Sequence, residues 1–284
     1  MHALPRSRLG FGFFASMSSS AARVGCGGGG GGGGGRDPSN NPAVGRLREL
    51  VQRGDAADGW EKSWETGVTP WDLGKPTPII EHLVKSGNLP KGRALGYDVV
   101  ALASPERFVV GLDISSTAVE KAKQWSSSLP NADCFTYLAD DFFKWKPSEQ
   151  FDLIFDYTFF CALDPSLRLA WAETVSGLLK PHGELITLIY LVTEESIYSL
   201  VYFSIEDVMR ISYYRLVTKK EDHHSIIQSP ILLRCPFRNH SYQKVLEPLG
   251  FKAILMEDNE LAIKPRKGQE KLGRWKRFVP GSSL

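Results

Sequence analysis

The first candidate functional group in this sequence is an acidic residue at the end of an apolar run. Residues 108–114 read Phe-Val-Val-Gly-Leu-Asp-Ile, and helical spacing follows from Thr117. The pattern predicts a buried parallel strand with Asp113 at its carboxyl edge, where open α/β sheets bind ligands. A carboxylate there suits the two hydroxyls of a ribose. Alternatively Asp113 only caps the next helix, although Thr117 and Glu120 already offer a capping box.

Three tryptophans close together are the second candidate group. Trp60 and Trp64 have a spacing that places both indoles on one face of a helix, and Trp71 follows in the glycine- and proline-containing loop 67–74. Indole faces attract a sulfonium or ammonium cation, so the three residues suit a cover over a cationic ligand. The alternative is that they pack a helix onto the sheet.

The elements that must position these groups alternate between strand and helix. Strands are predicted at 93–95, 108–114, 134–138, 151–157 and 184–190, and helices at 42–51, 60–64, 78–84, 96–103, 117–125, 164–179 and 242–249. A final hairpin is predicted from 251–256 and 260–263. We therefore expect an α/β, Rossmann-like fold, with a mostly parallel seven-stranded sheet, an antiparallel C-terminal hairpin and helices on both faces. This hairpin separates methyltransferases from nucleotide-binding dehydrogenases.

Composition narrows the range of partners. The chain has 284 residues, 42% of them hydrophobic, and a formal net charge of +2, which gives no basic field for nucleic acid. No apolar run approaches the roughly 18 residues of a membrane span. The four cysteines have no paired spacing and are expected to be reduced thiols, and no metal site is expected. The histidines (His82, His182, His223 and His224) are expected on the surface rather than as bases or metal ligands.

Domain boundaries follow from changes in composition. Residues 1–40 contain a long glycine run and are expected to be disordered, whereas 41–277 form the folded domain and 278–284 a C-terminal tail. The stretch 264–277 is predicted to be a solvated basic tail. We expect a cytoplasmic protein; the alternative is a plastid protein, if the arginine- and serine-rich residues 1–20 act as a transit peptide.

Several ordered segments carry a family resemblance. They are Trp60-x3-Trp64 through Pro78, Gly96-Tyr-Asp-Val-Val-Ala-Leu, Phe108-Val-Val-Gly-Leu-Asp-Ile, Asp141-Phe-Phe, Phe155-Asp-Tyr-Thr-Phe-Phe-Cys161 and Lys180-Pro-x-Gly-Glu-Leu-Ile-Thr-Leu188. Together they resemble the plant thiol/halide (thiocyanate) methyltransferases of the thiopurine methyltransferase-like family. The resemblance implies a class I methyltransferase that uses S-adenosyl-L-methionine to methylate small thiols, hydrosulfide, thiocyanate or halide ions.

The resemblance also implies roles for individual residues. Trp60, Trp64 and Trp71 would close over the cofactor, Asp113 would hold the ribose, Asp141 and Phe142 would contact the adenine, and Tyr157 would lie beside the methyl group. For Tyr157 the alternative is ordinary packing at a strand end. Halides and thiocyanate carry no proton to remove, so no catalytic base is named. The expected partner is a small-molecule or anionic nucleophile, which the sequence does not narrow further, and the expected assembly is a monomer or a weak oligomer.

The sequence departs from the family in two places. The glycine-rich loop after the first strand is shortened by about six residues, so that Gly96 is its last member and the strand keeps about three residues. Residues 192–235 are an atypical insertion. Two further hypotheses therefore stay open, a catalytically impaired or non-catalytic isoform and a nicotinamide-dependent enzyme. The absence of a G-x-G-x-x-G motif disfavours the nicotinamide-dependent enzyme.

Overall fold

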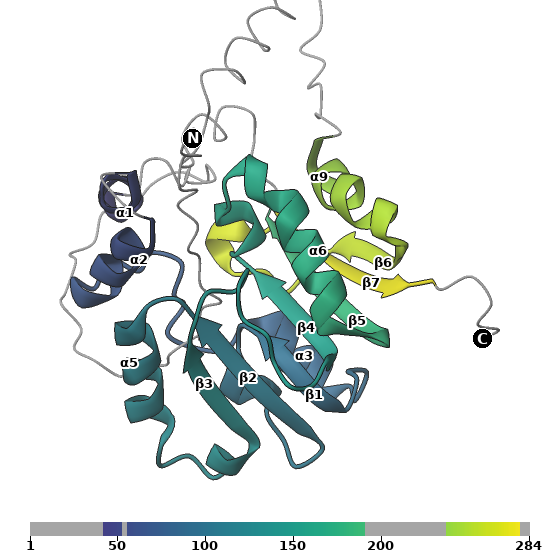
Figure 1. Cartoon of the computed structure of the whole chain (residues 1–284), viewed down its shortest axis with the longest axis horizontal. Coiled ribbons are helices and arrows are strands. Elements are labelled where there is room, and N and C mark those ends of the chain that lie inside the picture. The colour runs from purple at the N-terminus through teal and green to yellow at the C-terminus, as the bar shows by residue number, and fades with distance from the viewer. Residues whose placement is uncertain (1–41, 53–55, 191–236, 279–284) are drawn as a thin grey trace, which may run out of the picture.

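The chain folds around one seven-stranded sheet. The computed structural model describes residues 42–52, 56–190 and 237–278. The strand order is β3-β2-β1-β4-β5-β7-β6 (Figure 1), with bounds β1 Gly92–Gly96, β2 Arg107–Asp113, β3 Phe135–Ala139, β4 Phe151–Tyr157, β5 Leu179–Tyr190, β6 Phe251–Asp258 and β7 Glu270–Arg277. Strands β1 to β5 pair in parallel, and β7 is antiparallel to both β5 and β6. The predicted Rossmann-like methyltransferase fold is confirmed.

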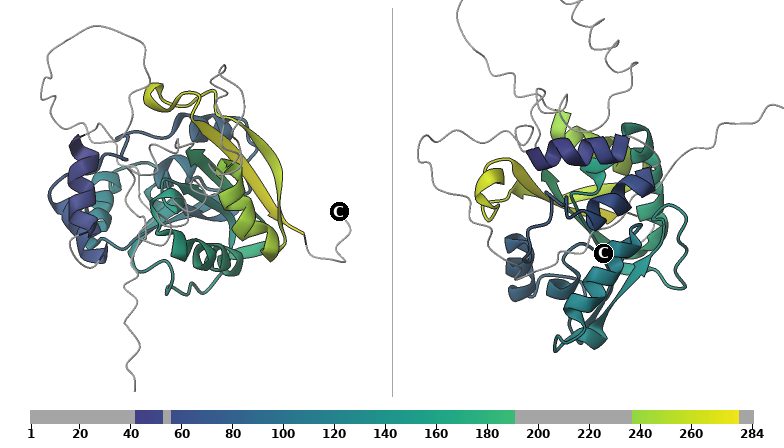
Figure 2. Two further views of the ribbon diagram at one scale, coloured as in Figure 1. Left: turned by 90° about the horizontal axis from the view of Figure 1, so that it is seen from above. Right: turned by 90° about the vertical axis from the view of Figure 1, so that its left-hand side faces the viewer.

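Helices cover both faces of this sheet. Their bounds are α1 Pro42–Gln52, α2 Ala56–Glu65, α3 Pro78–Lys85, α4 Val99–Leu102, α5 Ser116–Ser126, α6 Arg168–Leu178 and α9 Phe237–Leu246. In Figure 1, α6 crosses in front of the sheet and α3 lies behind it. In the left view of Figure 2, α1 and α2 lie together on one side of the molecule, and β6 and β7 lie on the other side.

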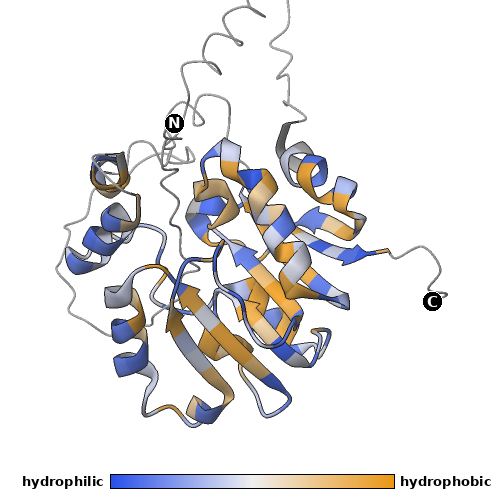
Figure 3. Ribbon diagram, viewed as in Figure 1, coloured by the Kyte–Doolittle hydropathy of each residue, from blue (hydrophilic) through white to orange (hydrophobic). Residues whose placement is uncertain are grey.

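The central strands are apolar because they are covered on both faces. One residue from each of the four central strands illustrates this burial, since all four are fully buried: Leu95 of β1, Val109 of β2, Ile154 of β4 and Ile186 of β5. Figure 3 shows the central strands mostly in the hydrophobic colour. Near-continuous burial is the pattern of parallel strands in doubly covered sheets. Because β1, β2 and β4 run parallel, their carboxyl ends meet at one edge of the sheet, which is the edge where open α/β sheets bind ligands.

The first crossover is short. Strand β1 has five residues, not the three predicted, because pairing with β2 begins at Gly92 and pairing with β4 continues to Gly96. Asp98 takes the left-handed conformation (φ 49°), and the four-residue α4 follows at once. A Cβ at Gly96 (φ 151°) would overlap the carbonyl oxygen of Phe155, so a glycine is required where β1 leaves the sheet.

The C-terminal region differs from the sequence prediction. The partner of β6 is Glu270–Arg277, and residues 260–263 belong to the connection between the two strands. The stretch 264–277 is therefore not a solvated tail. Trp275 is fully buried and donates from Nε1 to Thr187 Oγ1 at 3.0 Å, and Arg274 forms an ion pair with Glu184. The prediction was wrong because the lysines and arginines of this strand conceal its alternation of buried and exposed side chains.

Two smaller predictions also need correction. Ser115, not Thr117, is the N-cap of α5, and its Oγ accepts from the amide of Ala118 at 3.0 Å, so the predicted capping box does not form. Strand β5 begins at Leu179, before the predicted start at 184. His82 and His182 are exposed, as expected. The segments predicted for 1–40 and 192–235, the pair His223 and His224, and all of the predicted tail 278–284 except Phe278 lie outside the described residues.

Candidate functional site

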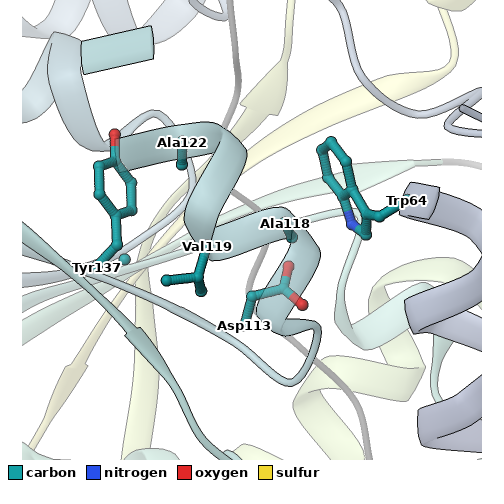
Figure 4. A pocket seen from close by; sticks show the side chains of 7 residues that line it. Trp64, Asp113, Ala118, Val119, Ala122 and Tyr137 are labelled. Atoms are coloured by element: carbon teal, nitrogen blue, oxygen red, sulfur yellow. The ribbon is translucent and has the colours of Figure 1, made fainter. Parts of the chain in front are cut away.

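A pocket of about 210 Å³ lies between α2, α5 and the ends of β2 and β3. It is lined by Trp64, Gly111, Asp113, Ala118, Val119, Ala122 and Tyr137. Figure 4 shows Trp64 facing Asp113 across the start of α5. The pocket is thus built from one strand-end carboxylate, one indole and small apolar side chains of α5.

Asp113 is the last residue of β2 and is buried, with 3% of its surface exposed. Its Oδ1 accepts from the amide of Ser115 at 2.8 Å, whereas Oδ2 has no hydrogen-bond partner among the described residues. Burial raises the pKa of Asp113 well above its ordinary value; the Glu61 carboxylate adds to this, and the amides of Ser115 and Ile114 oppose it. A buried, under-satisfied carboxylate oxygen in a pocket wall fits the hydroxyls of a ribose.

The three tryptophans lie together. Trp60 and Trp71 meet edge to face with ring centroids 5.2 Å apart, and Trp64 and Trp71 do so at 6.2 Å. All three are buried, and Trp64 lines the pocket whereas Trp60 and Trp71 do not. The structure therefore shows packing among the indoles and places one of them at the predicted site.

The acidic loop after β3 lies beside Asp113. The amide of Asp140 donates to the carbonyl oxygen of Asp113 at 3.0 Å. Asp141 accepts at Oδ1 from the amide of Phe143 at 2.9 Å and pairs at Oδ2 with Lys144 Nζ at 2.8 Å. Phe142 is fully buried, with its ring centroid 5.1 Å from that of Phe159. The two residues predicted to contact adenine thus adjoin the pocket without lining it.

Tyr157 is the last residue of β4, which pairs with β1 on the side opposite to β2. The ring of Tyr157 meets the ring of Tyr97, the residue after Gly96, edge to face, with the ring centroids 5.5 Å apart. This aromatic pair is almost completely buried. Gly96 and Tyr157 therefore lie on neighbouring strands at the same sheet edge as Asp113, as the sequence predicted.

A charged cluster around Tyr157 was missed by the sequence analysis. The Tyr157 hydroxyl donates to Glu270 Oε1 at 2.9 Å and contacts Nη1 of Arg266, and Asn259 Nδ2 donates to Glu270 Oε2 at 3.0 Å. Burial lowers the pKa of Arg266 and raises that of Glu270, while each charge opposes the shift of the other. The i,i+4 spacing of Arg266 and Glu270 was the signal in the sequence for this ion pair, but the stretch 264–277 was predicted to be a solvated tail.

These residues fit the ribose end of S-adenosylmethionine. Asp113 would supply the acceptor for the hydroxyls, and Trp64 lies opposite it across the pocket. Of the glycine-rich turn that usually lies beside the amino-acid end of the cofactor, Gly96 remains.

Comparisons with known proteins identify the family of the chain. The family model described as thiopurine S-methyltransferase matches residues 55–225. Probable thiol methyltransferase 2 of Arabidopsis thaliana is 52% identical over 229 residues, which cover 78% of this chain and 86% of that protein. Thiocyanate methyltransferase 1 of Brassica oleracea is 47% identical over 238 residues, or 82% of this chain and 88% of that protein.

A solved structure confirms the fold independently. The structure described in "Conversion of a Disulfide Bond into a Thioacetal Group during Echinomycin Biosynthesis" superposes with a TM-score of 0.52 at 20% identity, covering 78% of this chain and 92% of that one. The relatives give no support to a non-catalytic or nicotinamide-dependent protein. The chain belongs to the thiopurine S-methyltransferase family, and it is an S-adenosylmethionine-dependent methyltransferase.

Proposed function

We propose that this methyltransferase acts on small sulfur nucleophiles and anions, namely thiols, hydrosulfide, thiocyanate and halide ions. The observation that carries the proposal is the cluster around Tyr157, in which every charged group already has a protein partner. Glu270 is bound by Tyr157, Arg266 and Asn259. It is thus not placed to remove a proton, and the site suits acceptors that arrive without one.

The same cluster supplies features that favour an anionic acceptor. Arg266 stays charged despite its burial, because a guanidinium does not lose its proton in proteins. Its guanidinium carbon lies 5.1 Å from the ring centroid of Tyr157, and Tyr97 and Phe155 pack against the same ring. A cation in apolar, aromatic surroundings attracts an anion more strongly than a cation in water does.

The residues of the chain then have distinct tasks. S-adenosylmethionine supplies, when bound, a methyl group activated by its sulfonium sulfur. Asp113 would hold the ribose, and Tyr157 with Arg266 would orient the acceptor. Buried aromatic side chains exclude water, which favours a reaction that neutralises an anion and a cation. The main contribution of the protein is alignment of the reacting atoms.

The names of the relatives support the same acceptors, since one is called a thiol and another a thiocyanate methyltransferase. The test is the initial rate of S-adenosylhomocysteine formation with iodide, thiocyanate, hydrosulfide and an aromatic thiol. A catechol and an aliphatic amine serve as controls, because each needs a base to remove its proton. We expect turnover with the first group alone. Turnover confined to the catechol or the amine would overturn the proposal.

We also propose that residues 41–277 act as a single methyltransferase domain, a monomer or a weak oligomer in the cytoplasm. Large exposed apolar side chains of the described residues, such as Phe108, Leu169 and Ile254, are scattered over β2, α6 and β6 rather than gathered on one element. In the described part of the chain, no helix has the length and apolar character to cross a membrane. Light scattering and the location of a fluorescent fusion, with and without residues 1–20, test these statements.

A further inference from the structure

Helix α2 is attached to α5 by charged side chains as well as by packing. Glu61 of α2 reaches the first turn of α5, where Oε1 accepts from Thr117 Oγ1 at 2.6 Å, from Ser116 Oγ at 3.0 Å and from the Thr117 amide at 3.2 Å. In return, Lys121 of α5 donates from Nζ to the carbonyl oxygen of Trp64 at the end of α2. The two contacts join segments more than 50 residues apart in the chain.

The position of Glu61 suits the unsatisfied amides at a helix start. Three side chains serve the beginning of α5: Asp113 accepts from the Ser115 amide, Ser115 from the Ala118 amide, and Glu61 from the Thr117 amide. A carboxylate at this end is also stabilised by the helix dipole. Burial alone would raise the pKa of Glu61, but hydrogen bonds from Ser115, Thr117 and Ser116 outweigh it and lower that pKa. The carboxylate is therefore held in its charged form.

This attachment sets one wall of the pocket. Trp64 lies three residues after Glu61 and faces Asp113, Ala118 and Val119 across the pocket. Because Trp64 comes from α2 and the other lining residues come from α5, β2 and β3, the contact between α2 and α5 sets the width of the pocket. A weaker contact should let Trp64 move away from Asp113 more readily, and a bound cofactor should then leave faster.

We propose that Glu61 is a positioning residue for cofactor binding, which holds α2 on the start of α5 and thereby fixes Trp64 opposite Asp113. The inference depends on cofactor binding at this pocket and not on the nature of the acceptor. Binding of S-adenosylhomocysteine therefore tests it even if the proposed acceptors are wrong.

The experiment measures the affinity and the release rate of S-adenosylhomocysteine for the full chain. Glu61→Gln keeps the shape of the side chain and removes its charge. We expect about tenfold weaker binding, caused mainly by faster release that can be followed by tryptophan fluorescence. At saturating S-adenosylmethionine, kcat and the KM for thiocyanate should stay within about twofold of the wild type. A loss of overall structure would lower kcat as well.

The matched control is Glu120→Gln. It removes one carboxylate from α5 that is paired with Lys123 at 3.3 Å on the exposed side, and it should leave affinity and release unchanged. If Glu61→Gln does not fold, Thr117→Val removes the main partner from the other side and should weaken binding in the same way. Wild-type affinity and release in whichever of these two variants folds would overturn the proposal, because packing of the indoles would then be enough to hold α2.

Discussion

The hydroxyl of Tyr157 donates to Glu270 Oε1 at 2.9 Å, and this bond joins the end of β4 to the start of β7. The same hydroxyl contacts Arg266, so it lies between a buried cation and a buried anion. The family resemblance implies that Tyr157 lies beside the methyl group. The structure adds the pair of charges that fixes its orientation.

Removal of the Tyr157 hydroxyl should weaken binding of the acceptor rather than binding of the cofactor. We expect Tyr157→Phe to raise the KM for thiocyanate about five- to tenfold, because Arg266 and Glu270 lose their shared partner. The affinity for S-adenosylhomocysteine should change less than about twofold. Steady-state kinetics and calorimetry provide the two values. Tyr190→Phe, which removes a hydroxyl bonded to Gln269 at 3.0 Å, is the control and should match the wild type.

Cofactor affinity should depend on pH through Asp113. Its pKa is raised above the ordinary value by burial, and hydroxyl donors of a bound ribose stabilise the charged form, so binding should release a proton. We expect the affinity for S-adenosylhomocysteine to rise with pH, and calorimetry in buffers of different ionisation enthalpy to report the release. Asp113→Asn should bind about tenfold or more weakly and release no proton. Equal proton release in wild type and variant would rule out this role.

Asp98 should make the fold less stable as the pH rises. It is buried, accepts from the Thr77 amide at 3.1 Å, and burial raises its pKa to about 7, with smaller contributions from Glu81 and Asp72. The folded state therefore binds this proton more tightly than the unfolded state, whose aspartate pKa is about 3.9. The stabilisation is complete below about pH 4 and is lost as the pH rises through 7.

The variant Asp98→Asn tests this linkage. Asparagine tolerates the left-handed conformation at this position and retains an acceptor for the Thr77 amide. At pH 8 we expect the free energy of unfolding to increase by about 1 to 3 kcal/mol, with little change at pH 4. Urea denaturation at both pH values gives the comparison, and the exposed Asp133→Asn is the control. An equal effect at both pH values would show that the gain does not come from titration of Asp98.

The stability of the antiparallel end of the sheet should depend on Trp275. This side chain is fully buried and donates to Thr187 at 3.0 Å. We expect Trp275→Ala to lower the free energy of unfolding by about 3 to 5 kcal/mol. Phe278→Ala, at a side chain that is 42% exposed, should cost less than about 1 kcal/mol. Similar values for the two variants would contradict the structural role assigned to β7.

The turn after β1 should tolerate no side chain. A Cβ at Gly96 would overlap the carbonyl oxygen of Phe155 on the neighbouring strand. We expect Gly96→Ala to destabilise the protein by about 2 kcal/mol or more and to weaken cofactor binding with it. Gly177→Ala in α6 is the matched control, because a Cβ there meets nothing within 4 Å and alanine favours a helix. Thermal melting separates the two variants, and an unchanged melting temperature for Gly96→Ala would contradict this steric requirement.

Much of the fold could be predicted because the pattern of apolar residues is local. The run ending at Asp113 and the run 151–157 predicted β2 and β4, since parallel strands covered on both faces are almost continuously apolar. The carboxyl edge of such strands locates a ligand site without further information. Asp113, Gly96 and Tyr157 therefore lie at the edge where the sequence placed them.

The tertiary structure decided what depends on contacts between distant segments. Strand β7 lies between β5 and β6. Only in this position do its residues Arg274 and Glu270 become partners for Glu184 and Tyr157. The bond from Glu61 to Thr117 likewise replaces a capping box that looked complete within the helix sequence. A carboxylate from another element can satisfy a helix start as well as a local one can, and the sequence does not show which of the two is closer.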